Sequence, residues 1–228
     1  MHALGKSNQV VLALVKGRLL SFEVPSADRV VDGWDFVWGA AERPMTPAYW
    51  AAQAWMWALD APDHYRLGSN LEEEILACML GGYGIPAEIG LAAYDRLRAS
   101  MYASPDALRD ERAIFEALSA PFRFGARVVH YRFARQKAAY LAAAFQKLPN
   151  VNRRLDDAAL REELIELRGV GRKTASWIVR NLRGSDRVAI LDVHILKAGR
   201  SLGIFKPEHT VERHYLEHEA AYLRFANA

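Results

Sequence analysis

The sequence predicts a mainly α-helical protein with a small β-hairpin near its N-terminal end. Capping residues and prolines mark the start of one helical segment after another, and the links between these segments are short. Strand-like apolar runs occur in the first 24 residues. The 228 residues show no internal repeat and no low-complexity linker. A chain of this length is expected to fold as one compact module or as two small lobes.

The expected hairpin pairs residues 10–15 with residues 19–24, because the glycine in the linking segment 16–18 favours a tight turn. Thr46 and Pro47 then resemble an N-cap followed by proline at the first helical position, which predicts a helix to about Leu59.

The following helices are predicted mostly from their first residues. Asn70 is an N-cap residue, and three glutamates follow it in the first turn, where they complement the helix dipole. Further helices are expected at 86–101, 105–118, 133–148, 156–167, 172–182 and 192–202, and from Pro207 to near the C-terminus.

The composition is that of an ordinary soluble globular protein, with 51% hydrophobic and 25% charged residues. The single cysteine, Cys78, excludes an intramolecular disulfide framework and an iron–sulfur cluster held by four cysteines. The sequence shows no secretory signal pattern and no apolar run long enough for a membrane span. We therefore expect an intracellular, soluble protein without a membrane partner.

The positive charge is concentrated in two segments, although the net charge is only +3. Residues 161–200 contain nine Lys or Arg against five Asp or Glu, and residues 122–137 contain five basic residues, four aromatic residues and no acid. Basic side chains interleaved with aromatics are typical of nucleic-acid-binding surfaces. Solvated helix faces would explain either segment alone equally well, but two such segments flanking one motif favour nucleic-acid binding.

That motif is the glycine-bounded segment 167–175, which predicts a turn between two helices over about 156–183. Gly169 and Gly171 allow close approach, and the N–H groups that begin the second helix can hold a phosphate. Lys173 lies in the first turn of that helix, and Asp192 follows nineteen residues later. A helix, a short loop and the start of another helix could bring both side chains to one cleft. An amine and a carboxylate beside a phosphate-binding turn indicate chemistry on nucleic acid.

Segments 167–175 and 188–194 together resemble the helix-hairpin-helix and Gly/Pro…Asp signature of the HhH-GPD DNA glycosylase superfamily. Members with lysine at this place are bifunctional glycosylase/lyases, and Asp-Val-His at 192–194 resembles the 8-oxoguanine DNA glycosylases in particular. Because the chain is too short for the full extra N-terminal domain of the larger 8-oxoguanine enzymes, it resembles their compact prokaryotic branch. The resemblance implies two helical lobes with DNA across the cleft between them. One lobe would combine residues 1–66 and 190–228, and the other would contain residues 67–189.

The resemblance assigns chemistry to two residues. Lys173 matches the nucleophile that attacks the sugar C1′, displaces the damaged base and forms a Schiff base that permits β-elimination. An amine must be uncharged to attack, and the positive end of its own helix disfavours the ammonium form. Asp192 matches the carboxylate that stabilises positive charge on the sugar and assists proton transfer. The alternatives are a solvated first-turn lysine and a plain N-cap, and the latter is compatible with catalysis.

Further positions are assigned to binding. Enzymes that act on a base flip it out of the duplex and fill the gap with a wedge side chain. The wedge or stacking residue is expected at Tyr83, and the residues that sandwich the base at Tyr222 or Phe225, although core packing would also explain these aromatics. Tryptophans, including Trp177, are expected in the core. Contacts to DNA are expected from Gly169, Val170, Gly171, Arg172, Thr174, His194, Arg132 and Arg135. A buried imidazole would explain His194 equally well, and exposed charge on a helix would explain Arg132 and Arg135. The backbone carbonyls of Ile165, Leu167 and Val170 match positions that hold a structural monovalent cation.

The resulting hypothesis is an 8-oxoguanine DNA glycosylase with AP lyase activity, acting as a monomer on duplex DNA in the nucleoid of a prokaryotic cell. It requires no cofactor. One alternative is a glycosylase for an oxidised pyrimidine or an alkylated or mismatched base. The other is a non-catalytic DNA-binding module that uses the hairpin for phosphates alone.

Overall fold

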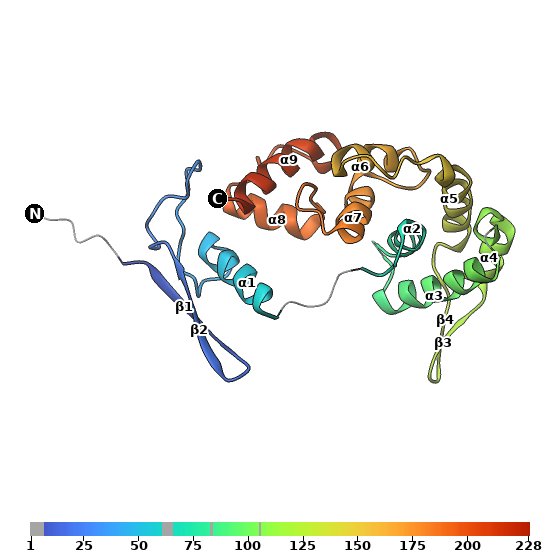
Figure 1. Ribbon diagram of the computed structural model, residues 1–228, viewed down its shortest axis with the longest axis horizontal. Coiled ribbons are helices and arrows are strands. Elements are labelled where there is room, and N and C mark those ends of the chain that lie inside the picture. Colours follow the sequence, from blue (N-terminus) through green and yellow to red (C-terminus); the bar gives the residue numbers. More distant parts are fainter. Residues whose placement is uncertain (1–6, 61–65, 83, 105) are drawn as a thin grey trace, which may run out of the picture. The chain divides into compact units, whose positions relative to one another are not determined.

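A computed structural model of the chain describes residues 7–60, 66–82, 84–104 and 106–228. These residues form a mostly helical structure with two short antiparallel hairpins (Figure 1), which confirms the predicted fold class. The elements, in order, are β1 (Gln9–Val15), β2 (Arg18–Val24), α1 (Pro47–Asp60), α2 (Leu71–Leu80), α3 (Ala87–Ala103), η1 (Ala107–Arg109), α4 (Glu111–Ser119), β3 (Phe122–Phe124), β4 (Arg127–Val129), α5 (Ala134–Lys147), η2 (Leu148–Asn150), α6 (Asp157–Ile165), α7 (Arg172–Arg183), α8 (Val193–Leu202) and α9 (Val211–Ala226).

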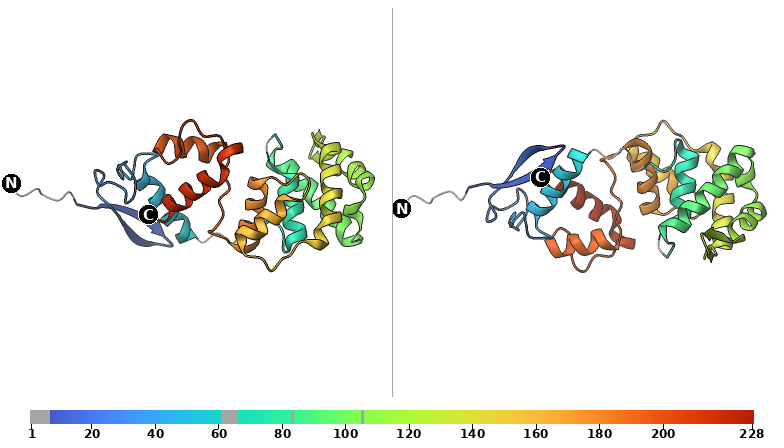
Figure 2. Two further views of the ribbon diagram at one scale, coloured as in Figure 1. Left: turned by 90° about the horizontal axis from the view of Figure 1, so that it is seen from above. Right: turned by 90° about the horizontal axis from the view of Figure 1, so that it is seen from below.

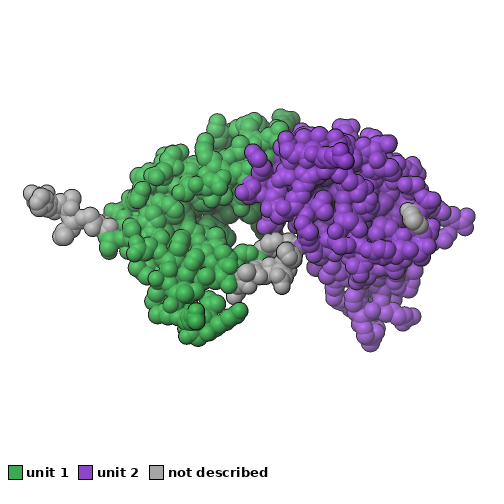
Figure 3. Space-filling model, in the orientation of Figure 1, with its two compact units in different colours: residues 1–64, 191–228 green, residues 65–190 purple. Residues whose placement is uncertain are grey.

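The chain divides into two compact units (Figure 3). Unit 1 combines residues 1–64 with residues 191–228, and unit 2 contains residues 65–190. Among the described residues, no helix has both the length and the apolar character needed to cross a membrane.

Unit 1 contains the N-terminal hairpin, in which Val11 pairs with Phe22 and Leu14 with Leu19. One face packs against α1, where Phe22 stacks on Trp55 with ring centroids 5.4 Å apart. A second aromatic cluster joins the loop after the hairpin to α9, because Phe225 contacts both Trp34 and Phe36. Rings therefore hold the N-terminal and C-terminal segments of unit 1 together.

Unit 2 is built around α2, which contacts α3, α5 and α7. Both views of Figure 2 show α2 beside α7. Its side chains Ile75, Leu76 and Leu80 are fully buried and belong to one continuous apolar core. A helix that is apolar on nearly all sides needs such neighbours, because no face of it can be left in water.

The N-terminal turn of α2 also buries two carboxylates. Glu74 accepts hydrogen bonds from the Gly68 N–H at 2.8 Å and from Asn181 Nδ2 of α7 at 2.6 Å. Burial raises the pKa of Glu74. Burial also opposes the charge of Glu73, but hydrogen bonds from Tyr102, Ser69 and Tyr94 lower its pKa overall. These bonds attach α2 to the helices that surround it.

Two expectations about the elements need correction, and one pair of strands was not expected. Residues 105–118 do not form one helix: η1 ends at Arg109, and Asp110 starts α4 by accepting the N–H groups of Arg112 and Ala113. The last helix begins after Thr210 rather than at Pro207, because Thr210 is still in extended backbone. The β3–β4 hairpin was not predicted, and its strands of three residues are too short to show a clear alternation.

Candidate active site

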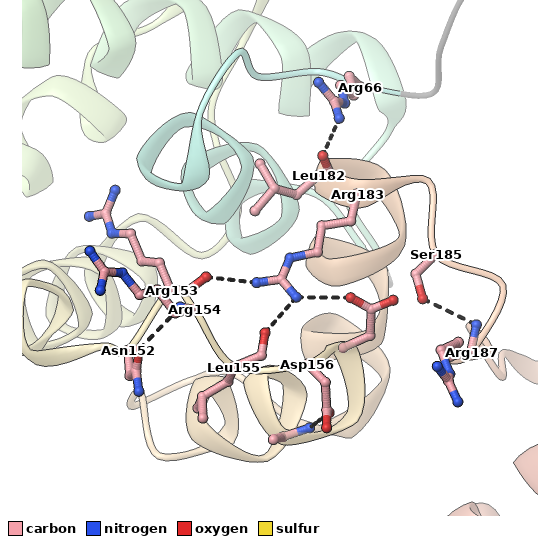
Figure 4. A network of polar contacts seen from close by, with 12 residues as sticks. Arg66, Asn152, Arg153, Arg154, Leu155, Asp156, Leu182, Arg183, Ser185 and Arg187 are labelled. Atoms are coloured by element: carbon pink, nitrogen blue, oxygen red, sulfur yellow. Dashed lines mark hydrogen bonds and ion pairs between the residues drawn. The ribbon is translucent and has the colours of Figure 1, made fainter.

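The helix-hairpin-helix consists of α6, the turn at 166–171, and α7. Leu164, Leu167, Val170 and Ile178 of this motif are buried in the apolar core of unit 2. At the far end of α7, the Arg183 guanidinium donates to the Leu155 carbonyl at 2.7 Å, to Asp157 Oδ1 at 2.9 Å and to the Arg153 carbonyl at 2.8 Å (Figure 4). Apolar packing and this arginine together define the angle between the helices.

The two glycines of the turn have different environments. Gly169 has φ +87°, and a Cβ built on it would lie 2.5 Å from the Tyr140 ring. Gly171 has ordinary backbone angles, and a Cβ there would meet no atom within 4 Å. Gly171 is also the N-cap of α7, and no described side chain caps this helix end. The start of α7 can therefore offer N–H groups to an anion.

Lys173 lies in the first turn of α7 and is partly buried. It borders a cavity of about 260 Å³ within unit 2. The other lining residues come from α2 and the turn after it, from the start of α5, and from the hairpin: Cys78, Met79, Gly81, Gly82, Phe133, Gln136, Lys137, Gly169, Thr174 and Trp177. Lys173 thus borders a cavity lined by aromatic, sulfur-containing and polar residues.

Asp192 is the N-cap of α8 in unit 1. Its Oδ1 accepts the N–H groups of His194 and Ile195, each at 2.9 Å. These two bonds orient the carboxylate and occupy one oxygen. Lys173 belongs to unit 2, so the surroundings of Asp192 and of Lys173 are each given within their own unit.

The remaining residues predicted to contact DNA are mostly exposed. Arg132 and Arg135 are exposed, and each guanidinium lies over an aromatic ring, that of Phe133 at 5.1 Å and that of Phe115 at 5.3 Å. His194 is exposed on α8. In the hairpin, Arg172 is exposed and pairs with Glu162 at 3.1 Å, and Thr174 borders the Lys173 cavity. The Val170 N–H donates to the Leu167 carbonyl at 3.0 Å, so this N–H is already hydrogen-bonded within the turn.

The aromatic residues predicted to recognise the base have different positions. Tyr83 lies outside the described residues. Tyr222 is partly buried, and Phe225 belongs to the aromatic cluster with Trp34 and Phe36. The expectation that the tryptophans lie in the core is wrong for two residues of α1, because Trp50 and Trp57 are exposed.

The predicted cation position consists of main-chain oxygens at the end of α6 and in the turn. The side chains of Leu167 and Val170 are buried, and the Leu167 carbonyl already accepts one hydrogen bond from Val170. A carbonyl oxygen has a second lone pair, and carbonyl oxygens suit hard cations. Across the described ranges, His, Cys, Asp and Glu side chains form no group of three or more suited to a metal ion.

Lys137 and Trp177 were not assigned to the site from the sequence, yet both border the Lys173 cavity. Trp177 follows Lys173 by four residues, a spacing that places two side chains on one helix face. That spacing could have identified Trp177. Lys137 lies in the basic segment 122–137, but its place in the wall of the Lys173 cavity depends on how α5 packs against α2.

These features define the class of protein: a helical DNA glycosylase of the helix-hairpin-helix type. Residues 91–228, more than half of the chain, match the family model Ogg-HhH, described as 8-oxoguanine DNA glycosylase. The chain therefore belongs to the 8-oxoguanine DNA glycosylase family.

Solved structures agree with this assignment. The 8-oxoguanine glycosylase/lyase of Methanocaldococcus jannaschii, in complex with a 15mer DNA containing 8-oxoguanine, is 26% identical with a TM-score of 0.50, over 69% of this chain and 72% of that one. The Thermotoga maritima 8-oxoguanine DNA glycosylase is 23% identical with a TM-score of 0.53, over 69% and 71%. A trapped endonuclease III–DNA covalent intermediate is 21% identical with a TM-score of 0.57, over 79% and 78%. The last two show a shared fold.

Proposed function

We propose that this glycosylase is bifunctional: it excises 8-oxoguanine from duplex DNA and then cleaves the strand by β-elimination. The observation that carries the proposal is the position of Lys173, whose side chain borders a cavity directly beside the hairpin turn. The Methanocaldococcus jannaschii relative, named as a glycosylase/lyase and bound to DNA containing 8-oxoguanine, supports the same activity and lesion.

In the proposed reaction the Lys173 amine attacks C1′ of the damaged nucleotide. The bond between C1′ and the base breaks, its electron pair leaves with the base, and the base takes up a proton. The amine loses one proton, which balances the proton that the base takes up. The C1′–O4′ bond then breaks, O4′ takes up a proton from solvent, and the nitrogen lone pair forms the C1′=N bond of a protonated Schiff base. Loss of a C2′ proton then expels the 3′ phosphate. Asp192 stabilises the positive charge that develops on the sugar and assists proton transfer.

The same proposal assigns DNA binding to the hairpin. The uncapped start of α7 and Arg172 hold backbone phosphate, and Arg132, Arg135 and His194 add positive or hydrogen-bonding contacts. A monovalent cation on the carbonyls of Ile165, Leu167 and Val170 would anchor a phosphate and take no part in the chemistry. We expect the active species to be a monomer on double-stranded DNA.

Borohydride trapping tests the nucleophile. The protein is incubated with duplex DNA containing a single 8-oxoguanine in the presence of borohydride, which reduces a Schiff base to a stable covalent adduct. We expect an adduct with the unchanged protein and none with Lys173→Gln, because an amide cannot form the imine. Lys206→Gln is the matched control, since Lys206 is exposed and lies between α8 and α9.

Three outcomes would contradict the proposal. Trapping that survives in Lys173→Gln would exclude Lys173 as the nucleophile. Strong excision of thymine glycol with none of 8-oxoguanine would assign a different lesion. Binding without base release or strand cleavage on every lesion tested would indicate a non-catalytic module.

A further inference from the structure

The C-terminal end of α2 forms part of the wall of the Lys173 cavity, through Met79, Gly81 and Gly82. The last carbonyls of a helix have no partner within the helix, and this end carries partial negative charge. α2 has no basic residue in its own last turn. Other parts of unit 2 must therefore satisfy these carbonyls.

Two side chains do so, Tyr131 from the segment before α5 and Lys137 from the first turn of α5. The Lys137 ammonium donates a hydrogen bond to the Met79 carbonyl, and the Tyr131 hydroxyl donates to the Leu80 carbonyl at 2.6 Å. Burial raises the pKa of Tyr131, so its hydroxyl keeps the proton that it donates. Of the two donors, Lys137 is the one that also borders the cavity.

The segment after α2 lies close to surrounding elements of unit 2. A Cβ on Gly81 would lie 3.6 Å from the Trp177 ring of α7. A Cβ on Gly90 of α3 would lie 3.6 Å from the Gly81 Cα. With α3 and α7 this near, a small shift of the α2 end would change the cavity wall. The hydrogen bonds from Lys137 and Tyr131 resist such a shift.

We propose that Lys137 is a positioning residue, which holds the end of α2 so that Met79, Gly81 and Gly82 form the cavity wall that receives the base beside Lys173. This inference rests on the proposed function. When the Lys173 amine reaches C1′, the base bonded to that carbon must lie next to the amine. The cavity that Lys173 borders provides the space for this base. Once the base has left, strand cleavage needs the amine and the sugar but no longer the wall. Loss of Lys137 should therefore slow base release far more than cleavage at an existing abasic site.

The test compares Lys137→Met with Lys147→Met. Lys147 lies on the same helix and also donates to a main-chain carbonyl, that of Glu166 at 3.1 Å, but it does not border the Lys173 cavity. Single-turnover rates are measured for base release from 8-oxoguanine duplex and for nicking of a duplex with a preformed abasic site. We expect Lys137→Met to slow base release about tenfold, equivalent to about 1.4 kcal/mol in the barrier, and to change nicking by less than about twofold. Lys147→Met should change neither rate.

Amide hydrogen exchange provides a second measurement, which does not depend on activity. Exchange at 79–82 should increase in Lys137→Met and remain unchanged in Lys147→Met. Tyr131→Phe removes only a hydroxyl, and it should increase exchange at the same residues even if Lys137→Met fails to fold. Unchanged exchange at 79–82 in the variants would overturn the anchoring role, and equal slowing of base release and nicking would overturn the positioning role. If the unchanged protein releases no base, the proposed function fails, whereas the exchange measurement still decides whether Lys137 anchors α2.

Discussion

Gly169 and Gly171 stand two residues apart in the hairpin turn, but they are glycines for different reasons. Gly169 has a positive φ, and the Tyr140 ring occupies the space that a side chain would need. Gly171 has neither constraint. Because Gly171 has no side chain, a ligand can approach the start of α7 closely. One glycine therefore serves the fold, and the other is available for binding.

We expect Gly169→Ala to lower the free energy of unfolding by more than about 2 kcal/mol, because backbone strain and a clash with Tyr140 add together. Urea unfolding of the purified variant measures this change. Gly171→Ala is the control for stability and should remain within about 0.5 kcal/mol of the unchanged protein. If Gly169→Ala had the same free energy of unfolding as the unchanged protein, the turn would be able to rearrange and avoid the clash with Tyr140.

At the scale of an element, α9 contains a buried histidine without hydrogen bonds. His218 is 2% exposed, and neither of its ring nitrogens has a partner among the described residues. Its ring lies 4.7 Å from that of Phe205 and 5.8 Å from that of His209. Burial lowers the pKa of His218, electrostatic interactions with His209, Arg200 and His214 lower it further, and Glu217 opposes the shift.

This shift makes stability depend on pH. Because the pKa of His218 is lower in the folded protein than in the unfolded chain, the unfolded chain binds a proton more readily. Acidification through the ordinary histidine pKa of about 6.5 therefore favours unfolding. Above that range both states carry neutral imidazole at this position, and the contribution of His218 no longer changes with pH.

We expect His218→Leu to raise the free energy of unfolding at pH 5.5 by about 1 kcal/mol or more, because it removes a buried polar ring that makes no hydrogen bond. The advantage over the unchanged protein should shrink as the pH rises to 8. Urea unfolding at several pH values measures both effects. His130→Leu changes an exposed histidine and should leave the pH dependence unaltered. An advantage that is constant from pH 5.5 to 8 would rule out titration of His218 as its cause.

At the scale of the whole molecule, the net charge of +3 understates the capacity to bind DNA. Exposed arginines, among them Arg132, Arg135 and Arg172, lie in or beside the segments that form the hairpin and the cavity. Phosphate contacts release counterions, so affinity for DNA should fall steeply as salt rises. The slope of log affinity against log salt is proportional to the number of phosphate contacts that the whole molecule makes.

Removal of one such contact should reduce this dependence by a definite amount. We expect Arg132→Ala to lower the slope of log affinity against log salt by about 1 and to weaken binding to duplexes of different sequence alike. Arg112→Ala is the control, because Arg112 is exposed on α4 and pairs with Glu116 at 2.9 Å. Fluorescence anisotropy at several salt concentrations measures the slopes. Equal slopes for Arg132→Ala and the unchanged protein would exclude a phosphate contact at Arg132.

Local signals explain which elements were predictable. Asn70, Asp156 and Asp192 each accept a hydrogen bond from a backbone N–H two or three residues later. The start of a helix therefore depends on a few neighbouring residues and can be predicted from them. The β3–β4 hairpin was missed because its support comes from elsewhere in the chain. The Arg96 guanidinium of α3 lies 3.6 Å from the centre of the Phe122 ring and donates to the Ala117, Ala120 and Pro121 carbonyls.

The helical class, the helix-hairpin-helix with its lysine, and the family can all be inferred from the sequence alone, because they depend on residue types at fixed short spacings. The surroundings of Lys173 depend instead on the tertiary structure. Met79, Lys137 and Trp177 are distant in the sequence, and they share one cavity because α2, α5 and α7 bury a common core. Packing between distant helices depends on the fit of many side chains at once, whereas a cap or a turn depends on a few adjacent ones.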